Sequence, residues 1–267
     1  MKRDEKSEGK LHNLLESCAF SQAEFFCFDS LSSTNDLAKE LSSAGHGQGT
    51  LVLADCQTAG RGRMGRCFQS PDQSGLYMSL VLRPDENQQS PGLLTACAAV
   101  AVRRAVFELT GQQTDIKWVN DLYYGGKKLC GILAEGQIGS SVALETVILG
   151  IGINISVPKE GYAPEISGQA ISLAEMPGQA PTFDRIELCA KIVSQFEAIY
   201  TAFPQKEFLE EYRAASLVLG KRISYQKAGV RYEGLALAID DEAQLVVETG
   251  GKTESLGTGE VSLVRPL

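Results

Sequence analysis

The stretch Gln57-Thr58-Ala59-Gly60-Arg61-Gly62-Arg63-Met64-Gly65-Arg66 brings three arginines and three glycines into one turn-prone segment. Residues 50–54 before it and residues 75–82 after it have β character, so the segment is predicted to connect two strands. Glycine lets a backbone approach a ligand closely, and guanidinium groups donate paired hydrogen bonds to phosphate or carboxylate oxygens. The segment therefore predicts a site for a small anionic ligand, with an ordinary solvated basic turn as the alternative.

The composition places this basic segment in an acidic chain. The 267 residues carry a formal net charge of -8, and 43% of them are hydrophobic, as in a globular protein with a real core. An excess of carboxylates argues against a nucleic-acid partner, which calls for a basic face. The seven cysteines are odd in number and show no C-x-x-C pair, so we expect reduced thiols rather than disulfides or a zinc site.

The apolar segments predict a cytoplasmic protein without a membrane partner. Residues 1–10 are polar and of mixed charge, and no apolar signal-peptide core follows them. The longest apolar segment, residues 93–102, is too short to cross a bilayer and is typical of a buried helix.

The pattern of the remaining segments predicts an α+β fold. Capping hydroxyls at residues 32–36 precede helical spacing, residues 91–109 form an apolar-faced helix, and Gly125-Gly126 marks a tight hairpin. From residue 221 onward, short β-like runs alternate with Asp and Gly turns. We expect residues 1–218 to form a mixed, mainly antiparallel sheet backed by helices, and residues 219–267 to form a small β-barrel.

Three more motifs share the chain with the arginine segment: Ser32-Ser33-Thr34-Asn35, residues 117–121 with residues 127–133, and Gly150-Ile151-Gly152-Ile153-Asn154. In order and spacing, the four motifs resemble those of biotin protein ligases. The resemblance runs from about residue 28 to the carboxyl terminus. It implies a class II synthetase-like biotin/lipoate ligase catalytic domain with an SH3-like barrel, of the monofunctional type that lacks an amino-terminal DNA-binding domain.

The resemblance also implies a two-step, ATP-dependent reaction. Biotin and ATP would form biotinyl-5'-AMP, and the biotinyl group would then pass to the ε-amine of a lysine on a biotin carboxyl carrier domain of acetyl-CoA carboxylase or a related carboxylase. We expect Mg²⁺ to accompany the nucleotide rather than occupy a dedicated protein cage, because this ion usually keeps several waters. A homodimer is a further expectation.

The chemistry requires fixed cations, because a biotin carboxylate must approach a triphosphate against several negative charges. The resemblance assigns catalytic roles to Lys128 and Arg63, and assigns orientation or deprotonation of the acceptor amine to Asp121. The implied biotin-binding residues are Ser33, Thr34, Asn35, Gln57, Gly60, Arg61, Arg63, Lys128, Gly131 and Leu133. The implied ATP-binding residues are Arg63, Arg66, Phe68, Lys117, Asn120, Lys128 and Asn154.

Each assignment has a structural alternative. Lys128 could be an exposed hairpin lysine, Ser33 and Thr34 could serve only to cap a helix, and Asp121 could close an Asx-turn. The chain also departs from the family pattern at two positions, with Val119 where many members carry proline and Phe68 where tryptophan is frequent.

Two other functions were weighed. Lipoate or octanoate ligases resemble the same fold and also make acyl adenylates, but their Arg-Arg-x-Gly-Gly-Gly-x-x-x-His-Asp loop is not found in this sequence. A biotin-responsive transcriptional repressor is less favoured, because the segment before Ser32 is short for a helix-turn-helix module and the chain is acidic.

Overall fold

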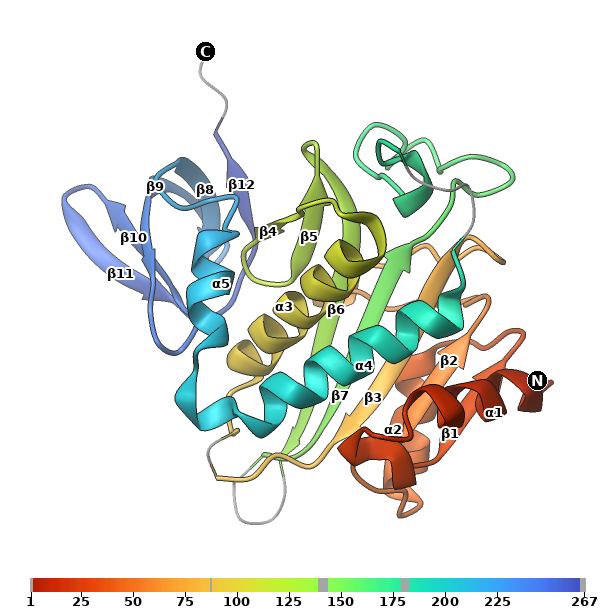
Figure 1. Ribbon diagram of the computed structural model, residues 1–267. Coiled ribbons are helices and arrows are strands. Elements are labelled where there is room, and N and C mark those ends of the chain that lie inside the picture. Colours follow the sequence, from red (N-terminus) through yellow and green to blue (C-terminus); the bar gives the residue numbers. More distant parts are fainter. Residues whose placement is uncertain (1, 87, 139–143, 179–182, 265–267) are drawn as a thin grey trace.

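The computed structural model describes residues 2–86, 88–138, 144–178 and 183–264. Its larger sheet has seven strands in the order β1-β2-β3-β7-β6-β5-β4 (Figure 1). The strands are β1 Phe25–Phe28, β2 Leu51–Ala54, β3 Gly75–Leu82, β4 Asp115–Lys117, β5 Asp121–Tyr124, β6 Lys127–Ile138 and β7 Leu144–Asn154. β1 and β2 run parallel, and the other neighbouring strands run antiparallel. The prediction of a mixed, mainly antiparallel sheet is confirmed.

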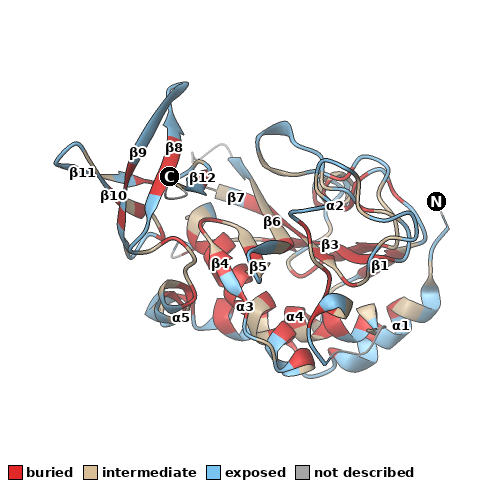
Figure 2. Cartoon of the chain, turned by 90° about the horizontal axis from the view of Figure 1, so that it is seen from above, coloured by how far each residue is buried: buried red, intermediate tan, exposed pale blue. Residues whose placement is uncertain are grey.

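Helices cover both faces of this sheet. They are α1 Glu5–Leu14, α2 Thr34–Ser43, α3 Pro91–Thr110, α4 Arg185–Thr201 and α5 Phe208–Ala214. Helices α1, α3 and α4 lie against one face and α2 lies against the other, which leaves every residue of β3 buried (Figure 2). Helix α3 begins with Pro91 after the N-cap Ser90 and ends at Gly111, whose φ of 67° suits glycine.

The carboxyl-terminal part forms a second sheet. Its strands are β8 Arg222–Lys227, β9 Val230–Ile239, β10 Leu245–Thr249, β11 Lys252–Leu256 and β12 Val261–Leu263. They pair antiparallel in the order β11-β10-β9-β8-β12, so the part predicted as a small β-barrel is present as a five-stranded antiparallel sheet whose outer strands are β11 and β12. Trp118 Nε1 donates a hydrogen bond to the Ala243 carbonyl (2.9 Å), which links the turn between β9 and β10 to the larger sheet.

The chain passes from one sheet to the other over a short distance. The Leu217 amide bonds the Ile116 carbonyl of β4 (2.8 Å), and the Gly220 amide bonds the Ala236 carbonyl of β9 (2.8 Å). A domain boundary between residues 218 and 219 is compatible with this crossover and stays a prediction.

Helix α1 was missed by the sequence analysis, which found only polar, mixed-charge residues near the amino terminus. Its N-cap Asp4 accepts a hydrogen bond from the Ser7 amide (3.2 Å), and Leu11 is buried beneath it. The Asp4 amide also bonds the Cys27 carbonyl (2.8 Å), so this segment covers the edge strand β1. Among the described residues, no helix is both long and apolar enough to cross a membrane.

Candidate active site

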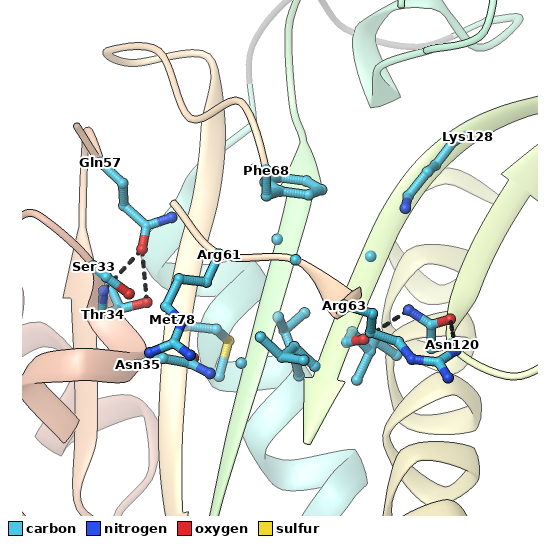
Figure 3. Close-up of a pocket in the computed structure, with 17 residues that line it drawn as sticks. Ser33, Thr34, Asn35, Gln57, Arg61, Arg63, Phe68, Met78, Asn120 and Lys128 are labelled. Carbon is cyan, nitrogen blue, oxygen red and sulfur yellow. Dashed lines mark hydrogen bonds between the residues drawn. The ribbon is translucent and has the colours of Figure 1, made fainter. Parts of the chain in front are cut away.

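A pocket lies where the start of α2, the arginine segment and strands β3, β6 and β7 meet (Figure 3). We call residues 57–68 the arginine loop. The pocket is lined by Ser33, Thr34, Asn35, Gln57, Arg61, Gly62, Arg63, Phe68, Met78, Asn120, Lys128, Gly131, Ile132, Leu133, Gly150, Ile151 and Gly152. Segments that are far apart in sequence therefore contribute to one cavity, as the four-motif hypothesis requires.

Two glycines of β7 make room for side chains of the pocket. A Cβ atom on Gly150 would lie 2.2 Å from Asn35 Oδ1, and one on Gly152 would lie 2.5 Å from the Phe68 ring. Both positions therefore exclude larger residues unless Asn35 or Phe68 moves. This glycine motif can be recognised in the sequence, but the side chains that it admits depend on tertiary contacts and could not be predicted from it.

The start of α2 and the arginine loop are joined by neutral hydrogen bonds. The Thr34 amide and Thr34 Oγ1 both donate to Gln57 Oε1, at 2.8 and 3.0 Å. Gln57 Nε2 donates to Ser70 Oγ (2.8 Å), and Ser70 Oγ donates to the Phe68 carbonyl (3.0 Å). Ser33 caps α2 by accepting from the Asp36 amide (3.4 Å), which leaves the Ser33 hydroxyl proton free for a ligand. Ser33 therefore caps α2 and also lines the pocket.

A carboxylate that the sequence analysis missed, Glu135 of β6, lies beside this network. Its Oε2 accepts from Asn35 Nδ2 (2.7 Å), and its Oε1 contacts Lys39 Nζ (2.9 Å) and an Arg61 guanidinium nitrogen (2.8 Å). Burial acts to raise the pKa of Glu135, but hydrogen bonds from Asn35 and Lys39 outweigh it and lower the pKa. Arg61 also pairs with Asp36, so this predicted biotin-binding residue is held by two carboxylates.

Arg63 is the most enclosed cation of the arginine loop. Its NH1 donates to Asn120 Oδ1 (2.9 Å), and Asn120 Nδ2 donates to the Ile132 carbonyl (2.8 Å). Burial lowers the pKa of the Arg63 guanidinium, although the group stays charged. A desolvated guanidinium whose hydrogen-bond partner is a neutral amide is suited to receive an anion.

The predicted catalytic lysine and the predicted base contact one another. Lys128 Nζ lies 2.8 Å from Asp121 Oδ1, with side chains 34% and 18% exposed, although the angle is not that of a hydrogen bond. Lys128 Nζ also lies 6.0 Å from the centre of the Phe68 ring. Lys128 lines both this pocket and an adjoining recess, which Asp121, Arg66 and Glu260 also line.

Arg66 connects the arginine loop to the carboxyl-terminal sheet. Its two terminal nitrogens lie 2.8 and 2.5 Å from the Glu260 carboxylate oxygens, and the side chains are 64% and 43% exposed. This bidentate contact raises the pKa of Arg66 and lowers that of Glu260. Within the loop, the Gly62 amide bonds the Arg66 carbonyl (2.8 Å), so the loop is a folded hairpin.

Three predicted ligand residues line neither the pocket nor the adjoining recess, and their roles, like those of the other predicted ligand residues, stay predictions. At Gly60, a Cβ would be 2.4 Å from the Phe68 carbonyl oxygen. Asn154 Nδ2 donates to the Ile171 carbonyl (3.0 Å), and Lys117 Nζ lies 5.5 Å above the Tyr123 ring.

The structure shows what surrounds Val119 and Phe68, the two residues that depart from the family pattern. Val119 is buried and its carbonyl accepts from Tyr212 Oη (2.8 Å), so the turn before Asn120 is anchored without proline. The Phe68 ring lies above β7 and packs edge-on against Tyr77, with ring centres 6.4 Å apart. It forms an aromatic wall without an indole N–H.

Comparison with known proteins identifies the family. A sequence model of the Biotin/lipoate A/B protein ligase family matches residues 27–154. The bifunctional ligase/repressor BirA of Bacillus subtilis is 39% identical over 88% of this chain and 72% of its own length. The biotin–[acetyl-CoA-carboxylase] ligase of Mycobacterium tuberculosis is 33% identical over 87% and 86%. The biotin protein ligase from Aquifex aeolicus, solved in complex with biotin and ATP, aligns with a TM-score of 0.76 at 27% identity, covering 91% of this chain and 99% of that one. The chain therefore belongs to the biotin protein ligases of the biotin/lipoate A/B protein ligase family.

Proposed function

We propose that this protein condenses biotin with ATP to biotinyl-5'-adenylate and then transfers the biotinyl group to a lysine of a carrier domain. The observation that carries the proposal is the polarity of the pocket. Its α2 end presents neutral donors and acceptors beside Arg61, whose charge is paired with Asp36 and Glu135. Its opposite end presents Arg63 and Lys128, and Asp121 lies next to Lys128. A small molecule with a neutral polar head and a carboxylate tail matches this order.

The α2 end suits the ureido ring of biotin, which has two N–H donors and one carbonyl acceptor. The free hydroxyl proton of Ser33 can donate to the carbonyl, and the hydroxyl oxygen of Thr34 can accept from an N–H group. The dithiolane of lipoate offers none of these partners. Lipoate would leave buried polar groups unpaired, which costs affinity.

In the first step, a biotin carboxylate oxygen attacks the α-phosphorus of ATP, and the bond to pyrophosphate breaks. Arg63 and Lys128 would hold the opposing oxygens and stabilise the charge that develops on them. Binding of the phosphates by Lys128 would draw its Nζ away from Asp121, which then becomes available for the second step.

In the second step, the acceptor amine attacks the acyl carbon and AMP leaves with the bonding electron pair. A lysine amine has a reference pKa near 10.4 and must lose a proton to attack. Asp121 would accept or orient that proton, because it lies in the recess beside Lys128.

Mg²⁺ is part of the proposal as a companion of the nucleotide. Asp121 Oδ1 is buried and accepts no hydrogen bond from the described residues, and Asn120 adjoins it. These hard oxygen donors fit Mg²⁺, which would neutralise phosphate charge when bound. No group of three His, Cys, Asp or Glu side chains within the described residues is placed to hold a metal.

We also propose a biotin carboxyl carrier domain as the acceptor, a cytoplasmic location and a homodimer. The name of the M. tuberculosis relative, a biotin–[acetyl-CoA-carboxylase] ligase, supports the acceptor. Light scattering with and without biotin and ATP would test the oligomeric state.

The decisive experiment is a pyrophosphate-release assay with MgATP, comparing biotin with lipoate on the folded protein. We expect release that depends on biotin, and label transfer to a carrier domain added afterwards. Release with lipoate alone would indicate the alternative ligase, and no release with either acid would overturn the proposed function.

A further inference from the structure

A continuous polar chain runs beneath the pocket and returns to the arginine loop at both ends. From Glu135 it passes through Asn35 to Ser79, whose Oγ lies 2.6 Å from Asn35 Oδ1 and 2.8 Å from Thr34 Oγ1. It then continues through Thr34, Gln57 and Ser70 to the Phe68 carbonyl, which belongs to the second stem of the loop.

The other end of the chain closes on the first stem of the loop. Glu135 Oε1 lies 2.8 Å from Arg61, and the Gly60 carbonyl accepts from the Phe68 amide (3.0 Å), so the two stems are tied together. The groups that face the ligand and the groups that fix the loop therefore share one network. Glu135 is a carboxylate of this network that contacts both α2 and the loop, and Asp36 of α2 is a second carboxylate that pairs with Arg61.

Glu135 has more hydrogen-bond and ion-pair partners than a simple structural ion pair requires. A single carboxylate here receives an amide of α2, a lysine of α2 and an arginine of the loop, and its side chain is only 19% exposed. The orientation of Asn35 is fixed at both ends of its amide, because Ser79 contacts Oδ1 in the space that Gly150 leaves open and Glu135 accepts from Nδ2. Removal of the Glu135 acceptor would leave only the Ser79 contact.

We propose that Glu135 is a positioning residue for biotin binding, which orients Asn35 at the floor of the pocket and holds Arg61 so that the arginine loop lies over the ligand. The proposal rests on the proposed function for the identity of the ligand. Its effect on the loop is independent of that function.

The test uses the full chain with Glu135→Gln, which keeps the shape and one acceptor oxygen but removes the charge. Glu145→Gln is the matched control, because Glu145 is an exposed carboxylate on the neighbouring strand β7. Arg61, Arg63 and Arg66 make the loop a substrate for trypsin, so the rate of cleavage there reports how firmly it is held. The Michaelis constants for biotin and ATP are measured on the same samples.

We expect Glu135→Gln to be cut in the loop about tenfold faster than the wild type, and to raise the KM for biotin about tenfold while the KM for ATP stays unchanged. Glu135→Asp should recover part of both effects, and Glu145→Gln should show neither. Arg61→Ala removes one trypsin site, so the double-mutant cycle compares the rates of cleavage after Arg63 and Arg66. In that cycle, adding Arg61→Ala to Glu135→Gln should raise the cleavage rate little further.

Loop cleavage and biotin KM equal to the wild type in folded Glu135→Gln would overturn the inference. An equal rise in both Michaelis constants would also overturn it, because a general loss of packing would then explain the effect. If Glu135→Gln fails to fold, Glu135→Asp and the Arg61 variant carry the same comparison. Loop cleavage that responds to Glu135 in a protein that releases no pyrophosphate would separate failure of the proposed function from failure of this inference.

Discussion

The two ends of the pocket differ in how completely their side chains are already satisfied. At the α2 end, Thr34, Asn35 and Gln57 are linked to one another through well-formed neutral hydrogen bonds. At the opposite end, Lys128 is paired with Asp121 and Arg66 with Glu260, in contacts that a nucleotide would have to replace. One end is joined by neutral hydrogen bonds, and the other contains cations paired with carboxylates.

From this difference we expect selectivity and catalysis to reside at different ends of the pocket. Preformed, buried polar groups discriminate between ligands, because a wrong ligand leaves their remaining donors and acceptors unpaired. Cations that exchange partners can follow charge as it develops during a reaction. Changes at the α2 end should therefore alter biotin affinity, whereas changes at the other end should alter turnover.

The largest effect is expected at Lys128. Lys128→Ala removes the cation nearest to Asp121, so biotin-dependent pyrophosphate release should fall by about 10²- to 10³-fold, while equilibrium biotin binding changes much less. Lys127→Ala is the control, because Lys127 is the exposed neighbour at the hairpin turn. A Lys128→Ala protein that releases pyrophosphate at the normal rate would contradict the assigned role.

The next effect separates the two chemical steps. Asp121→Asn keeps the side-chain shape but removes the proton acceptor, so transfer of biotin from preformed adenylate to a carrier domain should slow by about a hundredfold. Single-turnover measurements of adenylate formation and of transfer would distinguish the steps. If adenylate formation were the slower step in the variant and transfer were normal, Asp121 would act only as the partner of Lys128.

Much of the catalytic sheet could be predicted from the sequence, because strand alternation, capping residues and glycine turns are local signals. The strand β3 and the helix α3 begin at the predicted residues. Helix α1 could not be predicted, because its few apolar residues give only a weak helical periodicity. Its position depends on contacts with β1 and α4.

The site could be predicted only as far as its motifs extend. The motifs named most of the lining residues, since each motif contributes side chains to one pocket. Glu135 was not predicted, because its partners lie 74 to 100 residues away and nothing in its own segment distinguishes it. The use of Arg66 to bridge to Glu260, 194 residues distant, is a tertiary contact of the same kind.

A matched pair of glycine substitutions tests the comparison directly. Gly150→Ala would push Asn35 out of its hydrogen bonds with Ser79 and Glu135, so we expect the KM for biotin to rise about tenfold. Gly152→Ala would displace the Phe68 ring, which can move with the arginine loop, so we expect a rise of about threefold, confined to the KM for ATP. Steady-state kinetics with each substrate varied in turn would measure both Michaelis constants. A rise in the KM for ATP with Gly150→Ala and in the KM for biotin with Gly152→Ala would contradict the contrast between the two ends.

The smallest effect concerns the stability that each end gains from its carboxylate. Hydrogen bonding lowers the pKa of Glu260, and in Glu135 it does so against an opposing effect of burial. A folded-state pKa below the unfolded value means that each carboxylate stabilises the fold above about pH 4.3, and that this stabilisation is lost as the pH falls through the folded-state pKa. Near neutral pH, Glu135→Gln should lower the free energy of unfolding by roughly 1–2 kcal/mol, because its charge-assisted hydrogen bonds are partly buried. The exposed Glu260 pair should contribute at most about 0.5 kcal/mol.

Urea unfolding of the wild type, Glu135→Gln and Glu260→Gln at neutral and acidic pH would measure these differences. The gap between the wild type and Glu135→Gln should close on acidification, because protonation of Glu135 in the wild type removes the same charge that the variant lacks. A gap that stays constant with pH would assign the loss to packing rather than to charge. A larger loss for Glu260→Gln than for Glu135→Gln would show that the nucleotide end is also built in advance, against the contrast drawn from their exposure and partners.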